Sequence, residues 1–338
     1  MKKIISLILI SVLLFSLCAC SQSQKKEYSF FAMNTLMTVS FYSAENKNTD
    51  ELEQEIEAIT KDVENTLSAT EETSEVFSFN HRKNAEPFNI SDTLKNALKK
   101  ANEAYKLTNG AFDITVMPVL EQWGFDNGLY GVPKKDEIEK VLPYVGAEKL
   151  SLENNTLIAP EYVKISLGGI AKGFLGDNLL KYLEKNDISC VLSLGGNIVT
   201  VGEKKDGALW KIGVRDPLDE TRQLCTISLK GGYSVVTSGG YERYFEYNGK
   251  KYHHIIDTKT GYPADNGVLS ITVIGKDGAL CDALSTGLFV MGKEKAVELM
   301  STLNDFDYII VCDNKTIYTS LDKSVFTSEN NEYTVVFR

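Results

Sequence analysis

The sequence predicts an α+β protein in which a few helices pack against largely antiparallel sheets. Short runs rich in Val, Ile, Tyr and Phe recur along the chain and are typical of strands. Only a few segments show helical periodicity, and several strand-like runs follow one another without an intervening helix. Apolar residues make up 43% of the 338 residues, so a sizeable core can form.

The helical patterns begin with residues 50–68, which place five apolar side chains on one stripe. Ser91 or Asp92 caps a second helix, and Asn109-Gly110 ends it. Together, the expected helices cover residues 50–68, 92–109, 134–140, about 168–184 and 294–303.

Strand patterns fill much of the remainder. Residues 28–42 indicate a strand or a hairpin, and a polar loop is expected over residues 69–80. No repeat, low-complexity region or linker interrupts the mature chain, so residues 28–338 are expected to form one compact unit. Further strands are expected at residues 163–167, 189–194, 198–202, 210–214, 224–229, 233–238, 308–312, 316–319 and 333–337.

The start of the chain predicts a lipoprotein signal peptide over residues 1–19. Two lysines precede an apolar run, residues 4–17, that is too short to span a bilayer comfortably. The run LCAC at 17–20 resembles a bacterial lipobox, which would make Cys20 the lipidated first residue of the mature chain. An ordinary secretory signal with chance cysteines is the alternative. With residues 20–27 as a polar tether, we expect a lipid-anchored protein on the extracytoplasmic face of the cell membrane.

The net charge argues against one class of partner, and the cysteine spacing argues against a disulfide framework. The net charge of −10 argues against a nucleic-acid partner held by general electrostatics. The remaining cysteines are widely spaced, with no CxxC and no zinc pattern, so we expect small buried hydrophobic side chains rather than a disulfide framework. They are Cys190, Cys225, Cys281 and Cys312.

Residues 237–287 contain more turn motifs and candidate site residues than any other stretch of this length. It holds a hairpin signal, Asn248-Gly249, and two adjacent histidines, His253 and His254. In a strand these two side chains would face opposite sides, so only one of them could enter a given site.

A possible metal site closes that stretch. Asp282 suits the first turn of a helix, and Thr286 lies four residues on, on the same face. A carboxylate and a hydroxyl on one face make half a magnesium site, because Mg²⁺ prefers hard oxygen ligands and often adds substrate phosphates. A helix cap followed by a solvated threonine is the alternative.

The run GGIAKG at 168–173 stands between an expected strand and an expected helix. Such a glycine pair lets backbone groups approach a diphosphate, although the spacing is not that of a Walker A loop. Lys172 could reach a phosphate or an adenine edge. A plain tight turn and an exposed helix lysine are the alternatives.

Taken in order, these motifs resemble the ApbE family, the FAD:protein FMN transferases. The resemblance covers nearly all of the mature chain and implies that residues 28–338 form one flavin transferase domain with a T-fold-like unit. The matching pieces are MNT at 33–35, SEV at 74–76, GAFDIT at 110–115, SLGGIAKG at 166–173, SLGGNIVTVG at 193–202, GVRDP at 213–217, VVTSGGYERY at 235–244, HHIIDTKTGYP at 253–263 and CDALSTGLFVMG at 281–292.

The resemblance implies a Mg²⁺-dependent reaction on FAD. A threonine or serine hydroxyl of an acceptor protein attacks the FMN-side phosphorus, AMP leaves, and FMN remains phosphoester-linked to the acceptor. The acceptor is expected to be an exported flavoprotein of electron transfer, because the enzyme itself is expected to be exported.

The resemblance also implies site residues. His254 matches the histidine proposed as the base. Asp282 and Thr286 match magnesium ligands, with a backbone oxygen near Gly169 and with Ser285 as further candidates. The positions that match FAD contacts are Met33, Ala111, Phe112, Asp113, Ser166, Lys172 and the backbone around Ile256.

The chain departs from the family pattern at several positions that bear on FAD affinity. Asn34 replaces a usual glycine, Ser166 a common aspartate and Thr258 a usual proline. Thr70 falls near a position where many members carry an aromatic ring that stacks on the flavin.

Other functions share much of this machinery. Water in place of the acceptor hydroxyl would give a Mg²⁺-dependent FAD pyrophosphatase that releases FMN and AMP. A surface lipoprotein that binds FAD without chemistry, or a generic solute-binding lipoprotein, are the remaining alternatives. The Asp282–Thr286 pair and His254 favour a catalytic function over binding alone.

Overall fold

The computed structural model describes residues 26–42 and 49–338, and it confirms the α+β class. The predicted signal peptide, Cys20 and most of the tether lie outside the described residues. The central sheet has nine strands in the order β1-β2-β6-β7-β10-β15-β16-β17-β19, and only the pair β17–β19 is parallel. Its strands are β1 (Lys26–Ala32), β2 (Thr35–Phe41), β6 (Cys190–Leu194), β7 (Asn197–Val201), β10 (Tyr233–Gly239), β15 (Val268–Gly275), β16 (Phe306–Cys312), β17 (Thr316–Thr319) and β19 (Thr334–Phe337).

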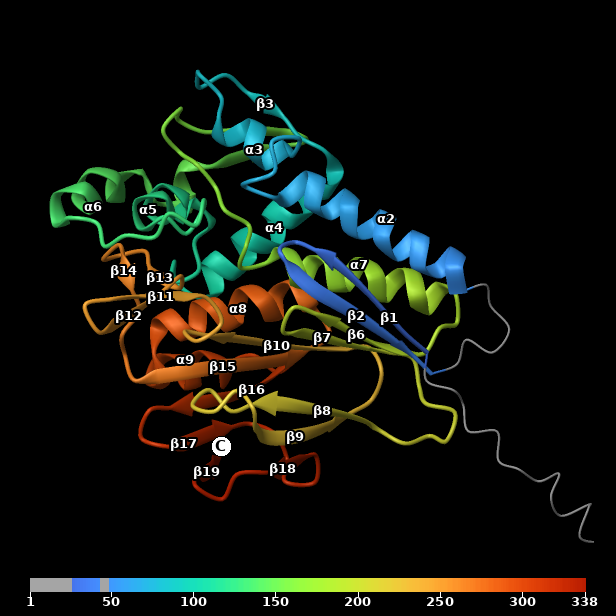
Figure 1. Cartoon of the computed structure of the whole chain (residues 1–338). Coiled ribbons are helices and arrows are strands. Elements are labelled where there is room, and N and C mark those ends of the chain that lie inside the picture. Colours follow the sequence, from blue (N-terminus) through green and yellow to red (C-terminus); the bar gives the residue numbers. More distant parts are fainter. Residues whose placement is uncertain (1–25, 43–48) are drawn as a thin grey trace, which may run out of the picture.

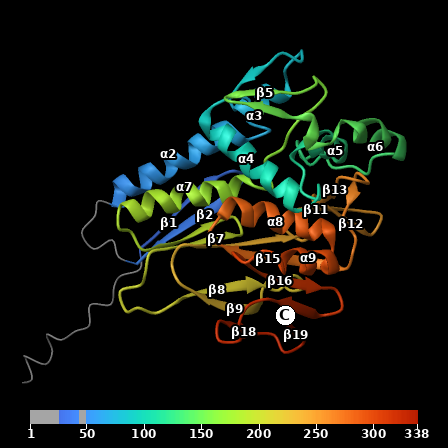
Figure 2. The same ribbon diagram turned by 180° about the vertical axis from the view of Figure 1, so that it is seen from behind.

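Helices cover one face of this sheet, the upper face in Figure 1, and Figure 2 shows the same layers from behind. The predicted stripe of the first helix faces this core, because Ile56 and Val63 are buried. As predicted, the Ser91 side chain caps the second helix by accepting from the Leu94 N–H. These helices are α2 (Thr49–Leu67), α4 (Asp92–Leu107), α7 (Ala171–Lys185), α8 (Gly278–Met291) and α9 (Lys293–Met300).

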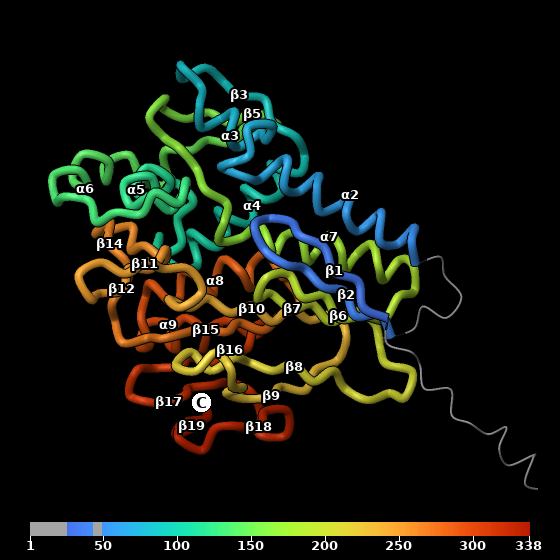
Figure 3. Tube along the Cα trace, in the orientation of Figure 1, coloured from blue at the N-terminus to red at the C-terminus, as the bar shows by residue number. Residues whose placement is uncertain are grey.

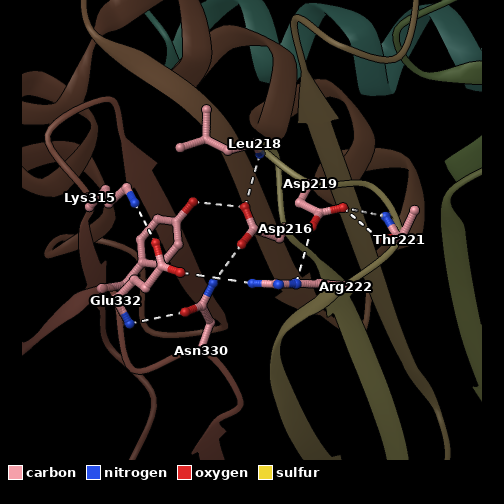
Figure 4. A network of polar contacts seen from close by, with 9 residues as sticks. Asp216, Leu218, Asp219, Thr221, Arg222, Lys315, Asn330 and Glu332 are labelled. Carbon is pink, nitrogen blue, oxygen red and sulfur yellow. Dashed lines mark hydrogen bonds and ion pairs between the residues drawn. The ribbon is translucent and has the colours of Figure 1, made fainter.

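A three-stranded sheet covers the opposite face, in the order β18-β9-β8. Its strands are β8 (Trp210–Arg215), β9 (Gln223–Leu229) and β18 (Phe326–Ser328). Alternate residues of β8 point inward and pack with Val235 and Ile309 of the central sheet. Figure 4 shows how the edge of this layer is fixed: buried Asp216 accepts from the Leu218 N–H and from the Asn330 side-chain amide.

The remaining elements form the upper and left parts of Figure 1. Elements η1, α5, α6, η2 and β11–β13 gather around a separate cluster in which Trp123, Phe125 and Ile256 are buried, whereas α3, β3, β4 and β5 pack against the main core. These elements are α3 (Glu75–Asn80), β3 (Phe88–Asn89), η1 (Ile114–Val116), α5 (Met117–Trp123), α6 (Lys135–Val141), η2 (Leu142–Tyr144), η3 (Ala147–Lys149), β4 (Ser151–Glu153), β5 (Thr156–Ile158), β11 (Tyr244–Tyr247), β12 (Lys250–His253), β13 (Ile256–Asp257) and β14 (Tyr262–Pro263).

Several local predictions are confirmed. Residues 28–42 fold as the β1–β2 hairpin, and Asn248-Gly249 closes the β11–β12 hairpin with both residues at positive φ, 51° and 76°. Cys190, Cys225, Cys281 and Cys312 are buried and free of disulfides. Over the part of the chain that the structure describes, no helix has the length and apolar character needed to cross a bilayer.

The strand predicted at residues 163–167 is wrong. Val163, Ile165 and Leu167 do point inward and are buried, but the segment pairs with no neighbouring strand among the described residues. Instead the Asn80 side chain accepts from the Ile165 N–H and donates to the Ile165 C=O, each over 2.8 Å. An amide side chain therefore provides the hydrogen bonds that a neighbouring strand would otherwise supply.

Two helix boundaries also differ from the prediction. The loop expected over residues 69–80 ends in α3, which Ser74 caps by accepting from the Phe77 N–H. Helix α8 begins at Gly278 with Asp277 as its cap, so Asp282 lies in the second turn rather than the first. One turn still separates Asp282 from Thr286, and the shared face remains.

Helices α7 and α8 pack unusually closely through glycine. A Cβ atom at Gly173 would lie 2.1 Å from the Gly278 carbonyl oxygen and 2.7 Å from the Asp282 Cβ, so no side chain fits there. Each of the two helices also accepts backbone hydrogen bonds from the other through a carboxylate. Asp282 Oδ2 accepts from the Gly173 N–H over 2.8 Å, and the Asp177 carboxylate accepts from the N–H groups of Gly278 and Ala279 over 2.7 and 2.9 Å. Burial raises the pKa of Asp177 to about 6.

We expect the Asn80→Ala variant to lose roughly 2–5 kcal/mol of unfolding free energy, because one buried N–H and one buried C=O of Ile165 lose their partner. Urea denaturation measures this loss. The matched control is Asn84→Ala, an exposed amide, which should stay within about 0.5 kcal/mol of the unaltered protein. Equal stability of the two variants would show that Asn80 does not hold the segment in place.

Candidate active site

A cavity of about 820 Å³ opens where segments far apart in the sequence meet, among them the tip of the β1–β2 hairpin, the start of α7 and helix α8. The chain trace in Figure 3 shows the β1–β2 hairpin and helices α7 and α8 in the same part of the molecule. This volume lies within the range of about 300–1,000 Å³ that is usual for ligand and cofactor sites. Nearly all of the residues singled out from the sequence line it together: Met33, Thr70, Ala111, Phe112, Asp113, Ser166, Gly169, Lys172, His254, Ile256, Asp282 and Thr286.

Asp282 and Thr286 of α8 form one end of the cavity. Asp282 is only 4% exposed, and this burial is the main cause that raises the pKa of its carboxyl group, while Lys172 and the Gly173 N–H act in the opposite direction. The Thr286 hydroxyl lies 3.2 Å from the Ser238 hydroxyl of β10. The two predicted metal ligands are therefore fixed by contacts from both α7 and the sheet.

Ser285 does not line the cavity. Its side chain is fully buried behind Thr286, where the hydroxyl donates to the Asp282 C=O over 2.8 Å and lies 2.7 Å from the Ser238 hydroxyl. Ser285 therefore supports the end of the cavity from behind.

The backbone at Gly169 lies against the same end. A Cβ atom there would be 3.4 Å from the Thr286 hydroxyl and 3.1 Å from the Phe112 ring. The absence of a side chain leaves the Gly169 backbone next to Thr286. Among the described residues, no group of three or more His, Cys, Asp or Glu side chains is arranged to hold a metal ion. The donor set of one carboxylate, one hydroxyl and nearby backbone fits Mg²⁺ that is also bound by substrate phosphates.

Sequence reasoning missed two polar residues at this end, Ser238 and Asn197. The Asn197 side chain lies near Asp282 and acts on that carboxyl group as a hydrogen-bond donor, which lowers its pKa, but the Nδ2 atom makes no hydrogen bond of normal geometry with any described residue. The signal that could have identified it is the turn Gly195-Gly196, with both glycines at positive φ, followed directly by a polar residue at the start of a buried strand.

His254 lies immediately after β12 rather than within it, and it lines the cavity. Its Nδ1 atom is 3.0 Å from the Arg243 carbonyl oxygen. A carbonyl can only accept, so Nδ1 carries the proton and Nε2 keeps its lone pair. Burial lowers the pKa of His254 to about 4, which leaves the ring neutral at pH 7.

His253 serves the fold instead. It is absent from the cavity lining, its Nε2 atom lies 3.0 Å from the Ala264 carbonyl oxygen, and its ring packs edge-on against Phe289. The two neighbouring histidines thus have separate environments, although strand alternation is not the cause, because His254 lies outside β12.

Aromatic rings surround His254 at its end of the cavity. The Phe125 ring lies 6.3 Å from the His254 ring in an edge contact, and Tyr130 stacks on Phe245 with ring centroids 5.4 Å apart. The Arg243 guanidinium donates to the Phe125 C=O. Arg243 therefore ties the loop of Phe125 and Tyr130 to the backbone that fixes His254.

Asp113 lines the cavity, but its carboxylate is already bonded within the protein. Oδ1 accepts from the N–H and the hydroxyl of Thr115, and Oδ2 accepts from the Ala147 N–H. These bonds shape the loop that presents Ala111 and Phe112 to the cavity. Thr258, one of the departures from the family pattern, donates its hydroxyl to the Gly110 C=O of the same loop over 3.1 Å.

Comparisons with known proteins identify the family of this chain. The model of the ApbE family matches residues 33–310. A FAD:protein FMN transferase of Haemophilus influenzae is 34% identical over 324 residues, covering 92% of this chain and 94% of that protein. One of Vibrio cholerae is 36% identical over 251 residues, covering 73% and 75%.

Solved structures of ApbE proteins also resemble this chain in fold. The crystal structure of an ApbE protein of Thermotoga maritima superposes with a TM-score of 0.81 at 35% identity and covers 87% of this chain and 96% of that one. The flavin transferase ApbE of Vibrio cholerae superposes with a TM-score of 0.78 at 30% identity, covering 90% and 97%. On sequence, fold and cavity together, this chain belongs to the ApbE family.

Proposed function

We propose that this protein transfers FMN from FAD to a threonine or serine hydroxyl of an acceptor protein, in a Mg²⁺-dependent reaction that releases AMP. One observation carries the proposal: a neutral histidine with an available Nε2 atom lines the same cavity as the Asp282–Thr286 pair. A base for a hydroxyl and a cation site for a diphosphate are the two requirements of this chemistry.

The end of the cavity at α8 would hold the diphosphate. Asp282, Thr286 and a backbone oxygen near Gly169 would bind Mg²⁺, which when bound supplies positive charge to the phosphate oxygens. Lys172, in the first turn of α7, adds an ammonium group. The N-terminus of α7, which is the positive end of the helix dipole, also lies at the cavity. These groups favour the negative charge that develops on the departing AMP phosphate.

His254 would take the proton of the acceptor hydroxyl at Nε2. As the O–H bond breaks, the oxygen forms a bond to the FMN-side phosphorus, and the bond between that phosphorus and the bridging oxygen breaks. The electron pair of the broken bond leaves with AMP, and FMN stays on the acceptor as a phosphoester. The hydrogen bond from Nδ1–H to the Arg243 C=O holds the ring in the tautomer that this step needs.

The direct test incubates the protein with FAD, Mg²⁺ and a candidate acceptor protein. Covalent flavin on the acceptor together with one AMP per flavin is the expected result. Free FMN and AMP without labelled acceptor would instead identify a pyrophosphatase, and bound but unchanged FAD would identify a storage protein.

We further propose that the protein acts outside the cytoplasm, anchored through a diacylglycerol on Cys20, because two acyl chains suffice for firm membrane attachment. Cys20→Ser should release the protein from the membrane fraction and abolish incorporation of labelled fatty acid. Continued labelling, with partition into detergent, would contradict the lipobox assignment.

Replacement of the carboxylate ligand should abolish transfer. We expect Asp282→Asn to lower the rate of FMN transfer at saturating FAD by about 100-fold or more, because the diphosphate charge is no longer neutralised as AMP leaves. Asp265→Ala, which removes an exposed carboxylate that does not line the cavity, is the control and should transfer at the normal rate. Near-normal turnover of Asp282→Asn at modest Mg²⁺ would remove Asp282 from the metal site.

Loss of the base should slow the chemistry without preventing binding. His254→Ala should keep its FAD affinity and melting temperature but lose roughly 10²–10⁴-fold in single-turnover transfer rate. His253→Ala is the neighbouring control and should lose far less activity. Because the pKa of His254 is lowered to about 4, the base form dominates above that pH, so transfer should rise as pH increases through about 4 and then stay level toward neutrality. An unchanged rate for His254→Ala would require another base.

A further inference from the structure

Asn197 is a buried polar residue whose hydrogen bonding is incomplete. It is only 2% exposed, and its Nδ2 atom, although near the Asp282 carboxylate, makes no hydrogen bond of normal geometry with any described residue. Buried amide donors are nearly always paired, so an unpaired one at a cavity points to a ligand that supplies the acceptor. Asn197 lines the cavity of about 820 Å³ described above.

The sheet fixes the position of Asn197. The residue begins β7 and is paired on one side with Leu194 of β6 and on the other with Val236 of β10. Its side chain lies on the same sheet face as that of Val199, because alternate residues share a face. A Cβ atom on Gly176 of α7 would be 2.9 Å from Val199 Cγ2, so this face is the one that packs against α7.

The neighbours of Asn197 define the chemistry of the ligand. Lys172, in the first turn of α7, and Asp282 line the same cavity. An ammonium group, the positive end of a helix of 15 residues and an amide N–H without a well-formed hydrogen bond favour an oxyanion, whereas the Asp282 carboxylate has the opposite sign and is the proposed metal ligand. Phosphate oxygens of a dinucleotide meet this requirement, whereas the flavin ring and the ribose carry no such charge.

We propose that the Asn197 amide donates a hydrogen bond to a diphosphate oxygen of FAD, which makes Asn197 a diphosphate-binding residue. The proposal rests on the proposed function, since it assigns a role within the same site. A fixed donor at the phosphate undergoing attack also contributes in the transition state, where negative charge on the departing oxygen increases.

The test compares two ligands that share the flavin ring but differ in the diphosphate. Dissociation constants of FAD and riboflavin are measured by flavin fluorescence in the presence of EDTA, so that no metal contributes. We expect Asn197→Ala to weaken FAD binding by about 10-fold or more, the usual contribution of a hydrogen bond to a charged group. Riboflavin affinity should stay within about twofold, and Asn197→Asp should weaken FAD further, because its carboxylate repels the phosphates.

Asn314→Ala is the matched control, because Asn314 lies in the exposed turn after β16. Melting temperatures establish that each variant is folded. An FAD-to-riboflavin affinity ratio that is the same in Asn197→Ala and in the unaltered protein would overturn the proposal. If, in addition, Mn²⁺ affinity without FAD falls in that variant, Asn197 acts by positioning Asp282 instead. The proposed function fails separately, when the unaltered protein binds FAD but transfers no flavin.

Discussion

The site depends on a reciprocal contact between α7 and α8. Each helix carries a carboxylate that accepts N–H groups at the start of the other: the buried Asp282 of α8 accepts from Gly173, and the half-buried Asp177 of α7 accepts from Gly278 and Ala279. The exchange satisfies backbone donors that an α-helix leaves unpaired in its first turn. It is possible only because residue 173 has no side chain, and it brings Asp282 to the cavity while fixing its orientation.

The two ends of the cavity are built from different parts of the fold. The end at α8, where we propose that the diphosphate binds, comes from the central sheet and from α7 and α8, whose apolar side chains belong to the main core. The end at His254 comes from the β11–β12 hairpin and the loop of Phe125 and Tyr130, joined through Arg243. Phe112 belongs to the α8 end, because it lies against both Gly169 and Gly287. The proposed base and the proposed metal ligands are thus held by separate supports.

Local signals in the sequence predict those parts of the fold that local interactions determine. The Asn248-Gly249 turn, the Ser91 cap and the stripe of α2 need no knowledge of distant partners. The segment 163–167 has a strand pattern, but its partner is the Asn80 side chain, 85 residues away. Family resemblance identifies most of the residues at the cavity, but it does not show that Ser285 lies behind it. The unpaired amide of Asn197 becomes visible only when the neighbours of β7 are in place.

With the proposed lipid anchor on Cys20, the length of the first strand limits how far the cavity can lie from the membrane surface. β1 leads directly from the predicted tether to Met33 at the cavity, and seven residues of strand span about 23 Å. The six residue-to-residue steps between Cys20 and Lys26 can add at most about 21 Å. With the lipid anchor that we propose, the cavity stays within about 45 Å of the membrane surface along this path. An acceptor must then present its hydroxyl in a layer that is about as deep as one small domain, so membrane-bound partners or those that approach the surface closely are favoured over proteins that diffuse far from it.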